Sequence, residues 1–143
     1  MAKMIEFPVR PIDLAAVDLS YGPCCMSFGF DLQPLLNSIR EVGLINSPLL
    51  YDNGDGGLGV IIGFRRLLAL KSMGRGRVDC RIMEQADRDM FGCLLLNLHD
   101  NMATRTFNEV EKGMALTLSA TCRCLDFHRA WKPLLFTRLL KNG

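Results

Sequence analysis

The feature that most constrains this chain is a strand-to-helix turn at a glycine, with two adjacent arginines beginning the helix. Residues 58–62 are apolar and partly β-branched, as is typical of a strand, and Gly63 follows them directly. Arg65 and Arg66 then open a helix that we expect to end near Gly74. Free backbone N–H groups and the positive end of the helix dipole meet at such a turn and favour an anion. The pattern therefore predicts a phosphate-binding turn.

The two arginines strengthen this interpretation, because cations are unfavourable at the positive end of a helix dipole unless an anion offsets them. Guanidinium groups also present forked donors that match phosphate oxygens. Two other interpretations stay open at this point. Arg65 and Arg66 are either solvated surface cations, or one of them, such as Arg66, pairs with an internal carboxylate.

Bulk composition narrows the class of protein. The 143 residues are 49% apolar and 22% charged, which is ordinary for one globular domain. No apolar run approaches the 18 or so residues of a membrane span, and the N-terminus lacks the apolar core of a secretory signal. We therefore expect a cytoplasmic protein without membrane contact. The net charge of +2 does not by itself indicate nucleic-acid binding.

Six cysteines are present, but no two of them form a C-x-x-C pair. The spacing therefore predicts neither a thioredoxin-like motif nor a paired zinc knuckle. In the expected compartment the cysteines should be reduced thiols that pack as small apolar groups.

Strand and helix signals alternate irregularly and predict an α+β fold, a small mixed sheet with helices packed around it. A turn rich in Asp, Asn and Gly should make the strand at 58–62 return antiparallel to the one before it. Helical spacing of apolar residues predicts the helices. The expected strands are 12–17, 48–51, 58–62 and 78–83, and the expected helices begin at Asp31, Arg65, Asp87 and Glu109.

The chain divides by composition into residues 1–120 and a different tail, residues 121–143. In the tail, basic side chains outnumber acids and apolar residues have a spacing that suits one amphipathic helix. This helix is expected to pack on the body or on a second subunit, and contact with a nucleic-acid backbone is the alternative.

A polar stretch at 99–106 should be a loop, since Asp100 and Asn101 favour turns. After it, Asn108 and Glu111 have the spacing of a capping box and predict the start of the last helix. His99 lies next to Asp100, but a histidine at a helix end is more often a capping group than a general base. No catalytic residue is therefore assigned.

Three segments, in order, resemble the boxes of the ParB/sulfiredoxin-like superfamily. Residues 38–48 resemble its first box, and residues 60–69 resemble the second, a V-I-x-G-x-R-R-x-x-A pattern. Residues 100–105, followed by 107–112, are similar to the third box of ParB proteins, an acid-Asn-x-x-Arg pattern and then N-P-x-E-K. One box alone is a weak signal, but three in order over residues 10–120 make the likeness specific.

The resemblance implies a site for CTP, or another nucleoside triphosphate, together with Mg²⁺. In ParB proteins the second box binds the triphosphate and the third lies near the nucleotide and its metal. Carried over, this implies metal contacts from Asp100 and Asn101. The implied nucleotide or phosphate contacts are Gly63, Phe64, Arg65, Arg66, Asn101 and Arg105, with Asn46 and Ser47 as weaker candidates.

The same resemblance implies a function. ParB proteins use this region as a CTP-gated clamp on DNA, so it implies a homodimeric switch in DNA binding, partition or transcription, acting on DNA directly or through a partner. Two departures stand out. Asp100 replaces the usual Glu, and Arg105 comes one residue later than in the family, so the loop bulges or the contact differs. Residues 121–143 are also too few for the helix-turn-helix domain that follows in ParB proteins.

Other functions of the same superfamily remain alternatives. A Mg-dependent nuclease would need a second acid beside Asp100, from Asp52, Asp55 or Glu111. An ATP-dependent phosphotransferase and a weak CTPase are also open, as is a truncated, non-catalytic interaction module. Sulfiredoxin activity is disfavoured, because residues 63–66 contain no cysteine where sulfiredoxin has its own.

Overall fold

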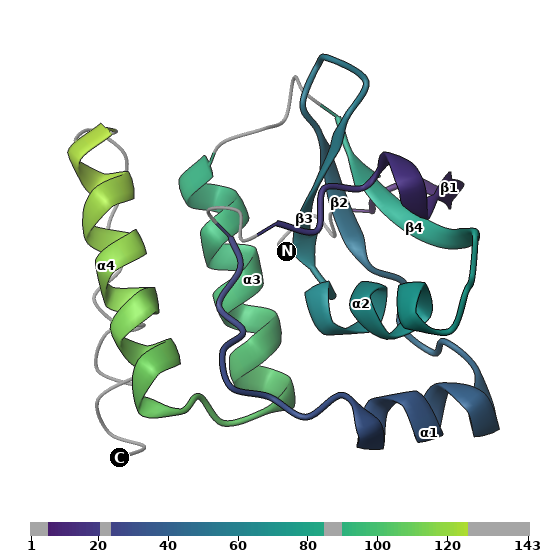
Figure 1. The fold of residues 1–143 in the computed structure, drawn as a ribbon. Coiled ribbons are helices and arrows are strands. Elements are labelled where there is room, and N and C mark those ends of the chain that lie inside the picture. The colour runs from purple at the N-terminus through teal and green to yellow at the C-terminus, as the bar shows by residue number, and fades with distance from the viewer. Residues whose placement is uncertain (1–5, 21–23, 85–89, 126–143) are drawn as a thin grey trace.

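The computed structural model describes residues 6–20, 24–84 and 90–125, which form one mixed sheet with helices packed around it (Figure 1). The strands are β1 (Val9–Asp13), β2 (Leu49–Asp52), β3 (Leu58–Ile62) and β4 (Arg77–Met83). The helices are α1 (Gln33–Val42), α2 (Phe64–Ser72), α3 (Met90–Thr104) and α4 (Glu109–Leu125), with a 3-10 turn, η1 (Leu14–Ala16), after β1. The expected α+β fold is confirmed.

The sheet has the strand order β1-β4-β2-β3. β1 pairs antiparallel with β4, and β2 pairs antiparallel with β3, as the turn between them predicted. β2 and β4 are parallel, so the sheet is mixed. The chain leaves β3 through Gly63, runs along α2 and returns to the sheet in β4, which places the start of α2 at the end of β3.

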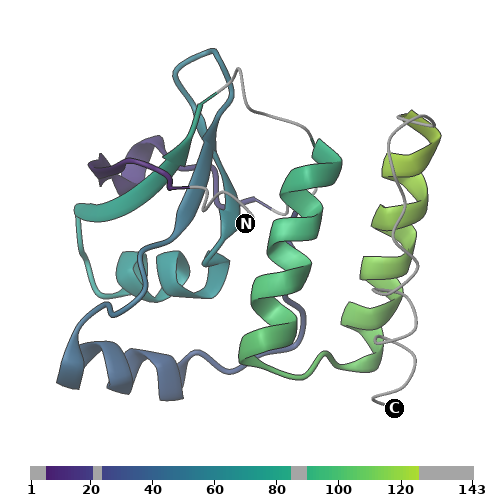
Figure 2. The ribbon, with the colours of Figure 1, turned by 180° about the vertical axis from the view of Figure 1, so that it is seen from behind.

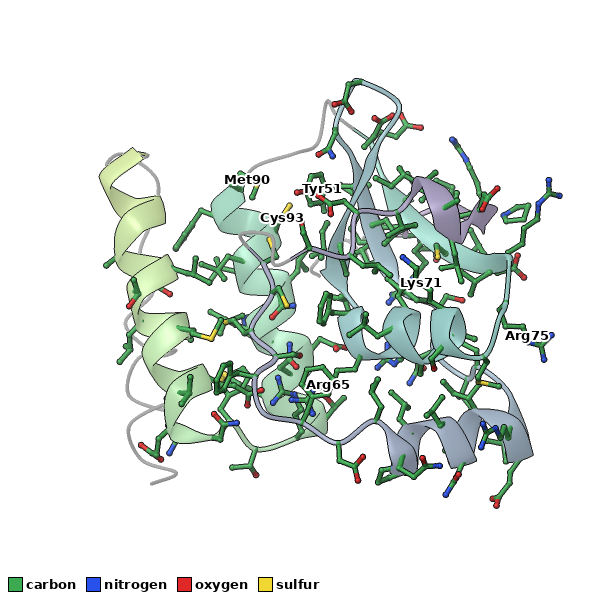
Figure 3. All side chains as sticks on the ribbon, viewed as in Figure 1. Tyr51, Arg65, Lys71, Arg75, Met90 and Cys93 are labelled. Atoms are coloured by element: carbon green, nitrogen blue, oxygen red, sulfur yellow. The ribbon has the colours of Figure 1, made fainter. Side chains whose placement is uncertain are left out.

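Alternating side chains give the sheet two apolar faces. One face packs against α1 and α2, through a buried cluster that includes Leu50, Leu67, Leu70 and Ile82. The other face packs against α3. Its cluster includes Leu49, Tyr51, Met83 and Cys93, and Figure 3 shows Tyr51 and Cys93 between the strands and α3.

A third buried cluster joins α3 to α4 and to the segment of residues 24–32. It contains Met26, Leu94, Leu98, Phe107 and Ala115. Figures 1 and 2, from opposite sides, show this segment running along α3 before it reaches α1, while α4 lies on the outer side of α3. The segment therefore packs against α3 and α4 through this cluster.

The first strand lies earlier than expected. Residues 12–17 were predicted as a strand, but β1 covers 9–13 and a 3-10 turn follows. Pro11 is tolerated because β1 is an edge strand, where a missing N–H costs no ladder bond. The Asp13 carboxylate accepts a hydrogen bond from the Ala15 N–H at 2.9 Å, which ends the strand and starts the turn.

The polar stretch at 99–106 is not the expected loop, because α3 continues to Thr104. Its polar side chains make contacts within the helix instead of breaking it. The Asn101 side-chain amide donates a hydrogen bond to Asn97 Oδ1, four residues earlier, and the Thr104 hydroxyl donates to the Asp100 carbonyl at 2.8 Å. Asp100 and Asn101 are therefore helical residues.

The remaining boundaries differ by small amounts. α1 begins at Gln33 with Leu32 as its cap, although the Asp31 carboxylate still accepts from the Gln33 N–H at 2.9 Å. α4 runs past residue 120 to Leu125. Asp87 and the tail helix expected beyond 125 lie outside the described residues. Within the described parts of the chain, no helix is long and apolar enough to cross a membrane.

Gly59 gives a direct test of the β2–β3 packing. It lies opposite Tyr51 in the register, and an added Cβ would overlap the Tyr51 ring. We expect Gly59→Ala to lower the free energy of unfolding by about 1–3 kcal/mol, because overpacking forces the ring to move. Gly76→Ala is the control, since nothing lies within 4 Å of its added Cβ. Urea denaturation measures both, and equal stabilities of the two variants would contradict the packing described.

Candidate phosphate-binding cavity

A cavity of about 280 Å³ lies where the end of β3, the start of α2 and one side of α3 meet. The segment 24–32 and the first residues of α1 complete its wall. The polar residues that line it are Ser27, Asp31, Arg65, Arg66, Asn97, Asp100, Asn101, Thr104 and Arg105, and Gly63 and Phe64 line it as well.

Gly63 brings the backbone to the cavity in a conformation that other residues rarely adopt. Its φ is +98°, and an added Cβ would come within 3.0 Å of the Pro48 side chain. The turn therefore requires glycine both for its dihedral angle and for close approach to Pro48. Gly63 is also the N-cap of α2, with no side-chain cap, so the first N–H groups of α2 have no capping partner from that residue.

Arg65 and Arg105 share one buried carboxylate, that of Glu111, and we refer to these three residues as the arginine–glutamate cluster. Arg65 Nη2 donates to Glu111 Oε1 at 2.8 Å, and Arg105 Nη1 donates to Glu111 Oε2 at 2.6 Å. The Glu111 side chain is 1% exposed, against 27% for Arg65 and 20% for Arg105. Figure 3 shows Arg65 reaching from α2 toward the lower part of α3.

The capping box at the start of α4 places Glu111 there. The Glu111 N–H donates to Asn108 Oδ1 at 2.9 Å, and the Asn108 N–H donates back to Glu111 Oε2 at 3.1 Å, as the sequence predicted. The Phe28 N–H donates to Glu111 Oε1 at 3.1 Å. One carboxylate thus accepts hydrogen bonds from two backbone amides and two guanidinium groups.

A row of polar side chains on α3 connects this cluster to the sheet. Asn97 is buried and donates to the Ile61 carbonyl in β3. Asn101 Nδ2 donates to Asn97 Oδ1 at 2.8 Å, and Arg105 Nε donates to Asn101 Oδ1 at 2.8 Å. These residues are four apart, so they lie on one face of α3 and its continuation.

The two arginines have further partners in the segment 24–32. Arg65 Nε donates to Ser27 Oγ at 3.1 Å, and its guanidinium carbon lies 4.4 Å from the centre of the Phe30 ring. Arg105 Nη2 donates to the Met26 carbonyl at 3.1 Å. Both guanidinium groups are therefore fixed in direction before any ligand binds.

Arg66 differs from its neighbour. Its Nη1 atom is buried and has no hydrogen-bond partner among the described residues, and the residue lines the cavity. The prediction that one arginine pairs with an internal carboxylate is correct in kind, but the paired residue is Arg65 and the unpaired one is Arg66. An unpartnered guanidinium N–H in a cavity is a donor available to an anion.

The charges of the cluster shift its ionisation. Burial raises the pKa of the Glu111 carboxyl, but hydrogen bonds from Arg105, Phe28 and Asn108 outweigh burial and hold that pKa below its ordinary value. Burial, together with repulsion from Arg105, lowers the pKa of the Arg65 guanidinium. We therefore treat Glu111 as an anion at neutral pH.

The structure brings most of the predicted site residues together. Gly63, Phe64, Arg65, Arg66, Asp100, Asn101 and Arg105 all line the cavity. Asn46 and Ser47 do not; the Ser47 carbonyl instead accepts hydrogen bonds from Arg81. The binding roles of all these residues stay predictions. Arg105 directly follows α3 and its N–H bonds to the Asn101 carbonyl at 2.9 Å, so no bulge inside a loop is needed to place it.

Sequence analysis gave the segment 24–32 no role in the site and named only Asp31 in it, as the start of a helix. This segment contributes Ser27 to the cavity wall and also brings Cys24 and Cys25 there. Burial raises the pKa of the Cys25 thiol, which opposes thiolate formation at the cavity. The sequence also named Glu111 only as a helix cap and as a candidate metal ligand, not as a partner of Arg65.

The residues fit Mg²⁺ in part. Within the described segments the Asp100 carboxylate makes no hydrogen bond, and Asp100 lines the cavity, whereas Asn101 Oδ1 already accepts from Arg105. Among the described residues no three of His, Cys, Asp and Glu gather as a metal site. Asp52, Asp55 and Glu111, the candidate second acids for a nuclease, do not line the cavity. A single carboxylate suits a Mg²⁺ ion that is held mainly by ligand phosphates and water.

Solved structures of known proteins include similar folds. No family model matches the chain, and no curated protein matches it. Among solved structures, it is similar to a C-terminally truncated chromosome-partitioning protein ParB from Caulobacter crescentus, complexed with CTP-gamma-S. The TM-score is 0.57 and the identity 25%, over 86% of this chain and 66% of that one.

Two further structures are similar. One is a Pnob8-like ParB-N domain, with a TM-score of 0.59 and 17% identity over 85% of this chain and 47% of that chain. The other is sulfiredoxin from Arabidopsis thaliana, with a TM-score of 0.45 and 21% identity over 54% of this chain and 85% of that chain. The chain thus spans just under two thirds of the Caulobacter chain and about half of the Pnob8-like one.

These likenesses define the class of fold, which is that of ParB N-terminal domains. The likeness agrees with the resemblance to the ParB/sulfiredoxin-like superfamily that the three sequence boxes indicate.

Replacing Glu111 tests the arginine–glutamate cluster. We expect Glu111→Gln to lower the free energy of unfolding by about 3 kcal/mol, because it leaves two partly buried cations without their counter-charge. Glu109→Gln, at an 88% exposed position two residues earlier in α4, should change it by less than about 0.5 kcal/mol. Chemical denaturation compares the two, and similar losses would show that the cluster has no special role in stability.

The same carboxylate predicts a pH dependence. Because the pKa of Glu111 is lower in the folded chain, its stabilising contribution is present above its ordinary pKa of 4.5 and is lost as pH falls through the lower, folded pKa. We expect the unfolding free energy of the wild type to fall more steeply below pH 4.5 than that of Glu111→Gln. Parallel pH profiles would contradict this assignment.

Proposed function

We propose that this chain binds a nucleoside triphosphate with its phosphates in the cavity at the start of α2. The observation that carries the proposal is the buried Nη1 atom of Arg66, which has no partner in the described residues, on a residue that lines the cavity with Arg65 and Arg105. Uncapped N–H groups of α2 lie at the same place and favour negative charge. A neutral ligand would leave the Arg66 donor without a charged partner.

A polyphosphate suits the cavity better than a single phosphate. Three arginines line it, two from the start of α2 and one from the end of α3, so donors are present for more than one phosphate group. The volume of about 280 Å³ fits the phosphates of a nucleotide, with the base and sugar at the open side. Asp100 would hold Mg²⁺ against these phosphates, where the metal offsets part of their charge.

CTP is the nucleotide that the ParB likeness favours, because the similar Caulobacter protein was crystallised with CTP-gamma-S. On the same basis we propose that the domain is a nucleotide-dependent switch that acts in chromosome partition or a related DNA-binding process. DNA, reached directly or through a partner, and a second copy of the chain are the proposed partners.

We propose binding, with hydrolysis slow or absent, as the activity. The cavity offers arginines that position phosphates, but His99, the one histidine considered as a base, is exposed and does not line it. Nothing in the described geometry favours the nuclease or the phosphotransferase.

Arg66 is the residue whose replacement tests the proposal. We expect Arg66→Ala to weaken binding of Mg-CTP by at least about tenfold, because a charge-assisted hydrogen bond to phosphate is lost. Stability should change little, since its Nη1 makes no hydrogen bond in the described residues. Calorimetric titration with CTP and with ATP, each with Mg²⁺, measures the affinity and the base preference.

Arg75→Ala is the matched control. Arg75 is an exposed arginine just beyond α2, away from Arg65 in Figure 3 and not part of the cavity wall. The Arg75→Ala variant should bind Mg-CTP with the affinity of the wild type. If the wild type binds no nucleoside triphosphate in the presence of Mg²⁺, the proposed function is wrong.

A further inference from the structure

We propose that Glu111 is an internal competitor of the anionic ligand. Its carboxylate holds the two arginines that the ligand also contacts, so ligand binding and the hydrogen bonds of Glu111 weaken each other. The inference rests on the proposed function, since it concerns the same cavity. It makes Glu111 a positioning residue that tunes affinity, not a residue that touches the ligand.

The positions of the three side chains support this role. Arg65 and Arg105 line the cavity, whereas Glu111 does not and is 1% exposed. Each guanidinium group therefore has the carboxylate on one side and the cavity on another. A guanidinium group has five N–H donors, and only some of those on Arg65 and Arg105 are used by Glu111, Ser27, Asn101 and Met26. The ligand can thus reach both arginines while Glu111 is still bound to them.

The charges of the cavity show why the two anions compete. Its lining holds three arginines and the two carboxylates of Asp31 and Asp100, and Glu111 lies directly behind two of the arginines. With Glu111 ionised, the three positive charges of the arginines are balanced by the three negative charges of Asp31, Asp100 and Glu111. A polyphosphate brings several further negative charges to the far side of the same guanidinium groups, where it repels Glu111. Coupling between two interactions is reciprocal. The free energy by which Glu111 weakens ligand binding therefore equals the free energy by which the bound ligand weakens the interaction of Glu111 with the arginines.

Two backbone amides report on this competition. The Phe28 N–H and the Asn108 N–H both donate to the Glu111 carboxylate, one from the segment 24–32 and one from the turn before α4. If the bound ligand repels the Glu111 carboxylate, the hydrogen bonds from these two amides become weaker. Ligand binding should therefore raise their hydrogen-exchange rates, although ligands usually slow exchange near their sites.

The first experiment is a calorimetric titration with inorganic tripolyphosphate and Mg²⁺, which removes any contribution of base or sugar. We expect Glu111→Gln to bind roughly tenfold more tightly than the wild type, because one opposing charge near the ligand is gone. Glu111→Asp retains the charge and should stay closer to the wild type. A merely structural role predicts the opposite, with weaker binding in both variants because the arginines lose their support.

The outcomes separate the two proposals. If the wild type binds neither tripolyphosphate nor Mg-CTP, the proposed function fails and the competitor role fails with it. If it binds Mg-CTP but not tripolyphosphate, the proposed function stands and the variants are compared with Mg-CTP. If the wild type binds, and folded Glu111→Gln binds equally or less tightly, the competitor role alone is overturned.

Should Glu111→Gln not fold, hydrogen exchange of the wild type decides by itself. Saturating tripolyphosphate should speed exchange at Phe28 and Asn108, and should leave the Ile82 amide, which donates to the Pro8 carbonyl in the sheet, unchanged. Unchanged or slower exchange at the first two amides overturns the inference.

Discussion

The hydrogen bonds of the buried Glu111 carboxylate are the interaction on which the arrangement of the cavity depends. The Glu111 carboxylate is bonded to α2 through Arg65, to the end of α3 through Arg105 and to the segment 24–32 through Phe28. A buried carboxylate is costly unless charges and hydrogen bonds compensate it, and here both oxygens are used. Because the compensation comes from separate segments, the ionised Glu111 carboxylate ties these segments to one another.

The negative charge of Glu111 also explains why the guanidinium groups of Arg65 and Arg105 can lie close together. Arg65 and Arg105 repel one another, and the charge of Glu111 offsets that repulsion. Glu111 keeps both in place, while Ser27, Asn101 and Met26 fix their directions. Arg66, one residue along α2, has no such partner in the described residues and supplies the donor that an incoming phosphate would pair with.

Local signals in the sequence predicted much of this fold. The turn at Gly63 and the capping box at Asn108 and Glu111 were both correct, because each depends on residues a few positions apart. The two asparagines of α3 show a limit of the same approach. Asn97, Asn101 and Arg105 have the four-residue spacing of one helix face, but the polarity of residues 99–106 suggested a loop. Asn97 also donates to the Ile61 carbonyl, 36 positions away, a contact that local spacing does not predict.

The role of Glu111 could not be predicted in that way. Its helix-capping function fully accounts for it as a local feature, so nothing in the sequence calls for a second one. The contacts that give it a second function reach 46 positions to Arg65 and 83 positions to Phe28. The segment 24–32 was missed for a related reason, since its conformation is set by its partners and not by its own periodicity. In this domain the residues that would contact phosphate have a sequence pattern, whereas the residues that hold them in position are recognisable only once the chain is folded.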